Sequence, residues 1–159
     1  MESVNQTRVF HLVRQPSRIW ELVFDLPGEK VNKLTREVMR EFGTVVETLE
    51  KEASQIDALL LRSGKSKSFV AGADIEMIRA TKSAQEAAEL SRKGQDLIGR
   101  FEDLSFVTVA LIDGACLGGG CEMALACTAM IASDSKATKI GLPEVNLGLL
   151  PGMGGCIRM

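Results

Sequence analysis

Two apolar runs near the start of the chain predict a β-hairpin. Residues 9–13 and 19–26 are rich in strand-forming residues, and the polar residues 14–18 between them include Pro16. Two such runs joined by a short segment that contains proline are typical of two antiparallel strands and their turn. A proline and a glycine follow directly and end the second predicted strand.

Two longer segments have the period of an amphipathic helix. In residues 35–52, apolar residues recur every three or four positions between charged ones, and Thr35 has the position and the side chain of an N-cap. A second helix is predicted to start after Ser83, whose spacing from Glu86 is that of a capping box. The residues predicted to share its apolar face are Ala87, Leu90, Leu97, Ile98, Phe101 and Leu104.

Shorter apolar runs predict strands between and after these helices. Residues 56–61 and 107–112 are continuous enough to be buried strands, and 131–133 and 138–140 are shorter candidates. Residues 122–126 predict another helix. Because strands alternate with helices, we expect an α/β fold with buried parallel strands after the opening hairpin. The last twenty residues, which are rich in glycine and proline, are expected to be mostly turn.

Composition and charge exclude several classes of protein. The chain has 159 residues, of which 45% are hydrophobic and 25% charged, which predicts a single globular domain over residues 1–159. The net charge of −2 provides no general basic field for nucleic acid or an anionic membrane. No apolar run approaches the length of a transmembrane helix, and residues 1–15 show neither a signal-peptide core nor a transit pattern.

The cysteines carry little sign of a metal site. Four of them, Cys116, Cys121, Cys127 and Cys156, lie late in the chain without a CxxC pair, and the single histidine, His11, lies far upstream. A four-ligand zinc site remains an alternative, but its usual spacing is missing. The interpretation we favour is four reduced thiols that pack as small hydrophobic side chains in the core of a cytosolic protein.

Three consecutive glycines, 118–120, stand between a predicted buried strand and a predicted helix. They do not extend to a dinucleotide motif, because Met123 occupies the position of its last glycine, and the loop at Gly64 lacks the upstream glycine of a P-loop. One interpretation is a tight, closely packed turn. The other is a place where backbone amides at a helix N-terminus bind an oxyanion.

Two glutamates near the glycine-rich segments are candidates for proton transfer. Glu122 follows the triple glycine, where an acidic residue is also favourable simply as a solvated residue in a first helical turn. Glu144 lies in an apolar stretch after Pro143, a setting that raises the pKa of a carboxyl group. Two carboxyl groups beside an oxyanion hole suggest proton chemistry next to a carbonyl group.

Four segments in order resemble the signatures of the crotonase (enoyl-CoA hydratase/isomerase) superfamily. They are FVAGADI at 69–75, DGACLGGGCEMA at 113–124, GLPEV at 141–145 and GLLPGMGG at 148–155. Within the superfamily, the CLGGG block and the run from GLPEV to LLPG are most similar to the hydratase part of multifunctional fatty-acid-oxidation α subunits. The resemblance implies a crotonase-type ββα spiral core.

The resemblance also implies an activity for the longer parent protein, the addition of water to trans-2-enoyl-CoA to give 3-hydroxyacyl-CoA, and leaves open whether residues 1–159 alone are active. The amides of Ala73 and Gly119 would form the oxyanion hole, Glu122 would activate the water, and Glu144 would protonate the α-carbon. The remaining residues that the motifs assign to substrate binding are Ala71, Gly72, Asp74, Ile75 and Gly152. No metal or redox cofactor is required. The alternatives are a Δ3-Δ2 isomerase on the same fold and a catalytically silent binding or assembly fragment.

Other expectations concern the differences from the family and its assemblies. Val107 stands where the family usually has proline, and Cys156 and Ile157 replace the usual Thr-Gln. Because family members continue through helices that complete the acyl pocket, we expect residues 1–159 to be the N-terminal part of a longer protein. Its expected partners are further copies of itself or a thiolase subunit of a β-oxidation complex, in the bacterial cytoplasm rather than in mitochondria. Without those helices, Leu147, Leu149 and Leu150 should be exposed.

Overall fold

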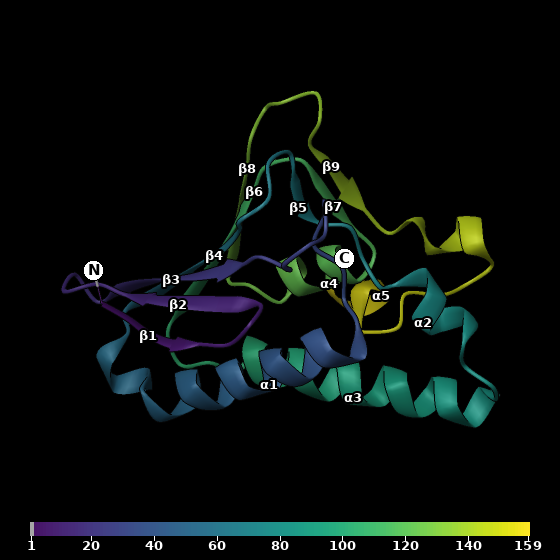
Figure 1. Ribbon diagram of the computed structural model, residues 1–159, viewed down its shortest axis with the longest axis horizontal. Coiled ribbons are helices and arrows are strands. Elements are labelled where there is room, and N and C mark those ends of the chain that lie inside the picture. The colour runs from purple at the N-terminus through teal and green to yellow at the C-terminus, as the bar shows by residue number, and fades with distance from the viewer. Residues whose placement is uncertain (1) are drawn as a thin grey trace.

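The larger of two β-sheets begins with the predicted hairpin. The computed structural model describes residues 2–159, with side chains from residue 7 onward, and Figure 1 shows the course of the chain. In spatial order the strands of this sheet are β1 (Glu2–Gln6), β2 (Phe10–Arg14), β3 (Ile19–Phe24), β4 (Ala58–Ser63), β6 (Val107–Ile112) and β8 (Ala129–Ala132). The first three strands are antiparallel, and β3, β4, β6 and β8 are parallel. The predicted hairpin and the parallel strands are confirmed, and β1 is an additional strand. The prediction that the parallel strands are buried holds only in part, because buried residues alternate with more exposed ones in β4 and β6, and β8 is exposed.

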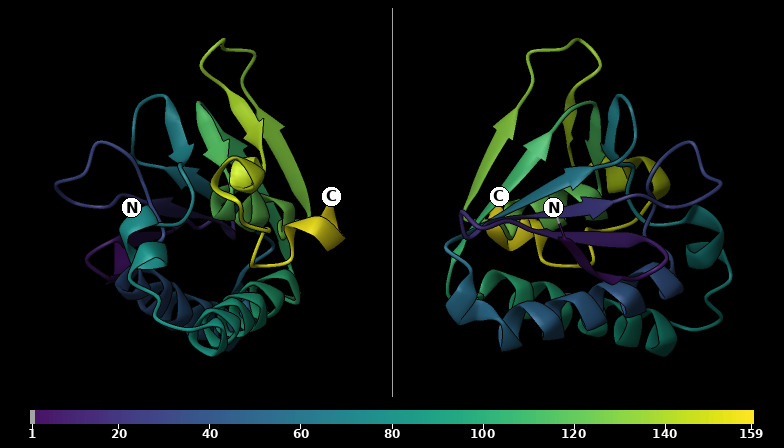
Figure 2. Two further views of the ribbon diagram at one scale, coloured as in Figure 1. Left: turned by 90° about the vertical axis from the view of Figure 1, so that its right-hand side faces the viewer. Right: turned by 60° about the vertical axis from the view of Figure 1, so that its left-hand side comes forward.

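The second sheet consists of three strands of three residues each. They are β5 (Ser68–Val70), β7 (Ala115–Leu117) and β9 (Lys139–Gly141), which pair in parallel in the order β5-β7-β9. Each follows a strand of the large sheet along the chain: β5 follows β4, β7 follows β6, and β9 follows β8. Figure 2 shows the two sheets side by side. Because helical segments follow each pair of strands, the fold is the ββα spiral that the sequence predicts.

Helical segments connect the strands and cover the large sheet. They are α1 (Arg36–Lys51), η1 (Ala53–Gln55), α2 (Ile75–Arg79), α3 (Ala84–Glu102), α4 (Gly119–Leu125), η2 (Pro143–Leu147) and α5 (Gly155–Arg158). The predicted caps are present, because Thr35 Oγ1 accepts from Val38 N and Ser83 Oγ accepts from Glu86 N, each at 3.1 Å. The Glu86 carboxylate accepts from Lys82 N, one residue before the donor that a capping box uses.

The main core lies between the large sheet and the helices α1 and α3, which run side by side under it (Figure 1). The ring of Phe42 on α1 lies 5.5 Å from that of Phe10 on β2 and 5.3 Å from that of Phe101 on α3. The predicted apolar face of α3 is only partly buried: Phe101 is fully buried, whereas Leu90 is half-buried and Ala87 is exposed. The N-terminal half of α3 instead faces a cavity, described below.

The cysteines correct one part of the sequence interpretation. Cys116 and Cys121 are buried in the core and Cys127 packs against it, all as free thiols, but Cys156 is exposed at the start of α5. The prediction that all four are core residues is therefore wrong for Cys156. Among residues 2–159, no group of three or more histidine, cysteine, aspartate or glutamate residues is placed to hold a metal ion. Within the same range, no helix has the length and apolar character to cross a membrane.

The C-terminal segment contains two short helices where turns were expected. Pro143 opens η2, and α5 begins after Gly154, which has the left-handed backbone conformation at a φ of 101°. Of the three leucines expected to be exposed, Leu147 and Leu150 are, the latter with 85% of its surface accessible. Leu149 is half-buried, and both Leu149 and Leu150 line the cavity.

Candidate active site

A cavity of about 620 Å³ lies between the helices and the glycine-rich segments. Its walls come from the N-terminal halves of α1 and α3, from α2, from the start of α4 and from the segment after η2. Five of the residues predicted to form the site line it, namely Ala73, Gly119, Glu122, Glu144 and Gly152. The structure therefore brings together residues that are far apart in the chain.

The amide of Ala73 is turned away from the neighbouring strand segment. Leu34 N donates to Gly72 O at 2.8 Å and Asp74 N donates to Leu34 O at 3.0 Å, which makes Leu34 and Ala73 a parallel bridge. In such a bridge the bonds of Leu34 go to the two neighbours of Ala73, so the N–H of Ala73 itself points to the opposite side. It finds no acceptor among the described residues.

The second free amide belongs to Gly119, the first residue of α4. The first amides of a helix have no acceptor within it, and that of Gly119 has none elsewhere in the described part of the chain. A Cβ atom added to Gly119 would lie 3.8 Å from Ala73 N, so the two amides are neighbours. Together they form a pair of unused donors at a helix N-terminus, which is suited to a carbonyl oxygen that gains negative charge.

The triple glycine has a packing role at two of its positions and a site role at the third. Gly118 has a φ of 53°, and a Cβ on Gly120 would lie 2.4 Å from Val70 O, so neither tolerates a side chain without a backbone shift. A Cβ on Gly119 would instead meet the mobile ends of Met153 and Leu34 and enter the cavity. The interpretation as a tightly packed turn therefore applies to Gly118 and Gly120, and the interpretation as an oxyanion site applies to Gly119.

Glu122 is held by two backbone amides. Its side chain is 2% exposed, and its Oε1 accepts hydrogen bonds from Met153 N at 2.7 Å and from Gly155 N at 2.8 Å. Within residues 2–159 its Oε2 takes part in no hydrogen bond, which leaves that oxygen for a ligand or a water molecule in the cavity. The alternative in which Glu122 is a solvated first-turn residue is wrong.

Glu144 reaches the same cavity from η2 but has a different environment. Its Oε1 lies against the backbone of Gly118, since a Cβ there would approach it to 2.7 Å, and its Oε2 is buried without a hydrogen-bond partner among the described residues. Burial away from water raises the pKa of Glu144, and the nearby charge of Glu122 raises it further. The site thus combines a carboxylate fixed by two amides with a carboxyl group whose pKa is raised by burial.

The other predicted binding residues support the Ala73 loop or lie beside it. Ala71, Gly72, Asp74 and Ile75 are not among the residues that line the cavity. Asp74 caps α2 through a 3.1 Å bond from Met77 N and pairs with Lys33 at 3.0 Å, which lowers the pKa of the Asp74 carboxyl group. The carbonyl oxygen of Gly152, which does line the cavity, accepts from Gln95 Nε2 at 2.9 Å.

Three residues of the site were not identified from the sequence. Met153 and Gly155 supply the amides that hold Glu122, and Arg158 holds the turn between them by donating to Met153 O and to the carboxylate of Glu102, each at 2.9 Å. The PGMGG turn was a visible signal for the two amides. Nothing in the local sequence around Arg158 indicates its contact with α3.

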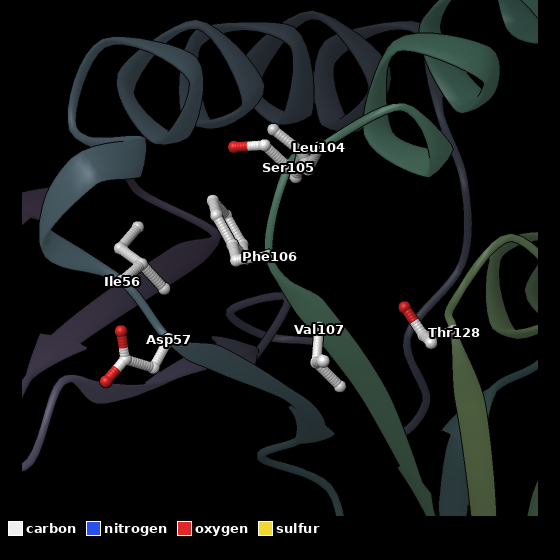
Figure 3. A pocket seen from close by; sticks show the side chains of 7 residues that line it. All are labelled: Ile56, Asp57, Leu104, Ser105, Phe106, Val107 and Thr128. Atoms are coloured by element: carbon white, nitrogen blue, oxygen red, sulfur yellow. The ribbon is translucent and has the colours of Figure 1, made fainter.

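A second, shallower pocket of about 420 Å³ lies at the other end of β4 and β6 (Figure 3). Its only carboxylate, Asp57, is already paired with Arg18 at 2.8 Å, and it contains no unused amide pair of the kind formed by Ala73 and Gly119. Its lining residues are Ile56, Asp57, Leu104, Ser105, Phe106, Val107 and Thr128. The first cavity is therefore the candidate active site.

The ββα spiral with this amide pair defines the class of protein as crotonase-type. Residues 14–159 match the family model described as enoyl-CoA hydratase/isomerase, and the chain belongs to that family. It is 46% identical over 156 residues to the fatty acid oxidation complex subunit alpha of Aliivibrio fischeri, covering 98% of this chain and 23% of the relative. The corresponding subunit of Shewanella amazonensis is 45% identical over 152 residues, or 96% of this chain and 21% of the relative. The chain thus spans about a fifth of the length of these curated relatives.

Solved structures show the same architecture. A Geobacillus kaustophilus structure described as an enoyl-CoA hydratase superposes with a TM-score of 0.87 at 29% identity, over 97% of this chain and 56% of that one. The enoyl-CoA hydratase of Thermoplasma volcanium gives a TM-score of 0.83 at 26% identity, over 96% and 58% of the two chains. These likenesses confirm the crotonase-type fold predicted from the sequence motifs.

Proposed function

We propose that this chain forms an enoyl-CoA hydratase site that adds water to trans-2-enoyl-CoA in syn fashion, giving 3-hydroxyacyl-CoA. The observation that carries the proposal is that Glu122 and Glu144 line one cavity together with the unused amides of Ala73 and Gly119. The similarity to fatty acid oxidation complex α subunits supports the same conclusion.

In the proposed reaction, the thioester carbonyl oxygen accepts hydrogen bonds from Ala73 N and Gly119 N. Negative charge develops on this oxygen as water adds to C3, and the two amides are already in place to stabilise it. Removing a single donor of this kind typically lowers kcat by about 10²–10³-fold. Ala71, Gly72, Asp74 and Ile75 are proposed to contribute backbone and side-chain contacts to the CoA part of the substrate.

The two carboxyl groups transfer the protons. The free Oε2 of Glu122 accepts a proton from the water as its oxygen bonds to C3, and the water lies near the amide of Gly152. Protonated Glu144 delivers its proton to C2. The raised pKa of Glu144 suits this role, because a proton donor must hold its proton near neutral pH. Proton exchange between the two glutamates and solvent restores the starting state, and the reaction requires neither a metal nor a redox cofactor.

The wider setting is also a proposal. Residues 1–159 would form one domain, in a bacterial cytoplasmic protein that assembles with further copies or with a thiolase subunit of a β-oxidation complex. The naming of the relatives as subunits of a fatty acid oxidation complex supports such partners. An isomerase, which moves a double bond with a single carboxyl group, and a silent assembly fragment are the alternatives that the experiment must separate.

The experiment is hydration of crotonyl-CoA by the chain and by two variants. Glu122→Gln and Glu144→Gln should each lower kcat by about 10²–10⁴-fold while binding of a saturated acyl-CoA stays within about threefold, because the amide keeps the shape but not the proton transfer. Glu47→Gln, at an exposed position on α1, is the matched control and should keep full activity. Near-parental hydration by either site variant would refute its assigned role, and a wild-type chain that binds without turnover would favour the assembly fragment.

A further inference from the structure

One end of the active-site cavity is lined by basic side chains. Where the cavity reaches the gap between α1 and α3, Arg36, Arg40 and Lys93 are among its lining residues. Arg36 is paired with Glu86 of α3 at 2.6 Å. Arg40 and Lys93 form no ion pair with any residue that the structure describes. The cavity therefore ends in two cationic groups without a protein counter-ion.

Two contacts show that Arg40 and Lys93 face each other across this gap. On one side of them, Arg36 of α1 pairs with Glu86 of α3, and on the other, Gly43 of α1 lies against the side chain of Leu97 of α3. Arg40 lies between the two contact points on α1, and Lys93 lies between them on α3. The two helices run side by side in both views of Figure 2.

The rest of the cavity lining is largely apolar. It consists chiefly of Met39, Met77, Ile78, Leu90, Leu97 and Met153. Methylene groups fit such a wall, because burial of apolar surface is favourable there.

The turn that holds Glu122 packs against the part of α3 that carries Lys93, since Gln95 Nε2 donates to Gly152 O at 2.9 Å. The side chain of Met153, whose amide holds Glu122, lies against Gly94 on α3, and its end reaches Gly119. In the proposed reaction the acyl carbons beyond C3 run past Glu122. The far end of the acyl chain, and not the CoA group, therefore points toward Lys93 and Arg40.

We infer, on the basis of the proposed function, that Arg40 and Lys93 bind a carboxylate at the far end of the acyl chain, so that the cavity prefers CoA monothioesters of dicarboxylic acids. A methyl terminus would make no polar contact with Arg40 and Lys93, which are exposed side chains at the cavity lining. A carboxylate would accept hydrogen bonds from both, and bonds between charged groups are stronger than those between neutral ones.

The test compares two saturated ligands of equal acyl length by titration calorimetry, the CoA monothioester of a dicarboxylic acid and that of a monocarboxylic acid. Both carry the same CoA phosphates, so the difference in Kd isolates the terminal carboxylate. The wild-type chain should bind the dicarboxylic ester several-fold more tightly. Arg40→Gln and Lys93→Gln should each reduce that preference by up to about fivefold, the effect of an exposed ion pair, and added salt should reduce it as well. Arg92→Gln, an exposed neighbour outside the cavity lining, should leave it unchanged.

Two outcomes would overturn the inference. One is an equal Kd for both esters in the wild-type chain. The other is that Arg40→Gln and Lys93→Gln weaken the binding of both esters equally, which would assign the two cations to the CoA phosphates. Because saturated esters are not turned over, the binding result is independent of hydration. Turnover of crotonyl-CoA without a preference for the dicarboxylic ester overturns only this inference. A preference for the dicarboxylic ester without turnover overturns only the proposed function.

Discussion

The amide of Met153 donates a 2.7 Å hydrogen bond to Oε1 of Glu122, which ties the C-terminal glycine turn to the carboxylate at the start of α4. The position of Glu122 therefore depends on a turn whose supporting residue, Arg158, is not part of the cavity lining. Arg158 fixes the carbonyl group of Met153 and is itself paired with Glu102 at the end of α3. A side chain outside the cavity lining thus controls the geometry of the proposed water-activating group.

We predict that Arg158→Leu lowers kcat by roughly 10–100-fold with little change in the Kd of acyl-CoA, because small displacements of a reacting group reduce the rate steeply. Steady-state kinetics with crotonyl-CoA and calorimetry with a saturated ester separate the two effects. Arg100→Gln is the control, since Arg100 forms a comparable ion pair with Glu50 away from the site. Equal losses in kcat for both arginine variants would show that only general stability is involved.

Substitutions at two adjacent glycines should have different consequences. Gly120→Ala places its Cβ 2.4 Å from the backbone oxygen of Val70, so we expect a loss of about 1–3 kcal/mol in the free energy of unfolding. Gly119→Ala meets only the ends of Met153 and Leu34, which can move, but it narrows the cavity beside the amide pair. It should fold normally and bind acyl-CoA weakly. Denaturant unfolding together with ligand titration checks both, and equal stability losses would contradict the distinction.

Glu144 should make stability depend on pH. Because its pKa is raised in the native state, the folded chain holds a proton there that the unfolded chain releases at the same pH. The stability that protonated Glu144 contributes is fully present below the pKa of an unfolded glutamate, about 4.3. It is lost as the pH rises through the higher pKa of Glu144 in the native state. Glu144→Gln, which stays neutral, should therefore have a higher Tm than the wild-type chain near pH 8. The difference in Tm between this variant and the wild-type chain should disappear near pH 4. An equal difference in Tm at pH 4 and pH 8 would contradict this account.

The long periodic elements could be predicted from the sequence because their signals are local. The strands of the hairpin and the helices α1 and α3 are each five or more residues long, which is enough to show a repeating apolar pattern. The caps Thr35 and Ser83 accept hydrogen bonds from amides only three residues away. Of the small sheet, only β9 was anticipated, by the strand candidate at 138–140. Strands of three residues have no detectable period, and β5, β7 and β9 are stabilised by parallel partners far away in the chain.

The candidate site was predictable where the family motifs assign a role, including the amides of Ala73 and Gly119, but not for the main-chain groups that hold Glu122. The positions of Glu122, Glu144 and the glycines follow from the resemblance to the crotonase superfamily. The donors that hold Glu122 are amides, which every residue except proline possesses, so the sequence does not mark them. The partial exposure of α3 has a related cause: its apolar residues near Leu90 line a cavity, and periodicity does not distinguish a cavity wall from a core.

The most direct test of the proposed activity follows the atoms of water into the product. The chain is incubated with crotonyl-CoA in deuterated water enriched in oxygen-18, and the thioesters are analysed by mass spectrometry. The proposed roles of Glu122 and Glu144 predict 3-hydroxybutyryl-CoA with oxygen-18 at C3 and one deuterium at C2, and neither label with Glu122→Gln or Glu144→Gln. Deuterium without oxygen-18 would indicate an isomerase, and unlabelled crotonyl-CoA recovered from the wild-type chain would contradict the proposed function.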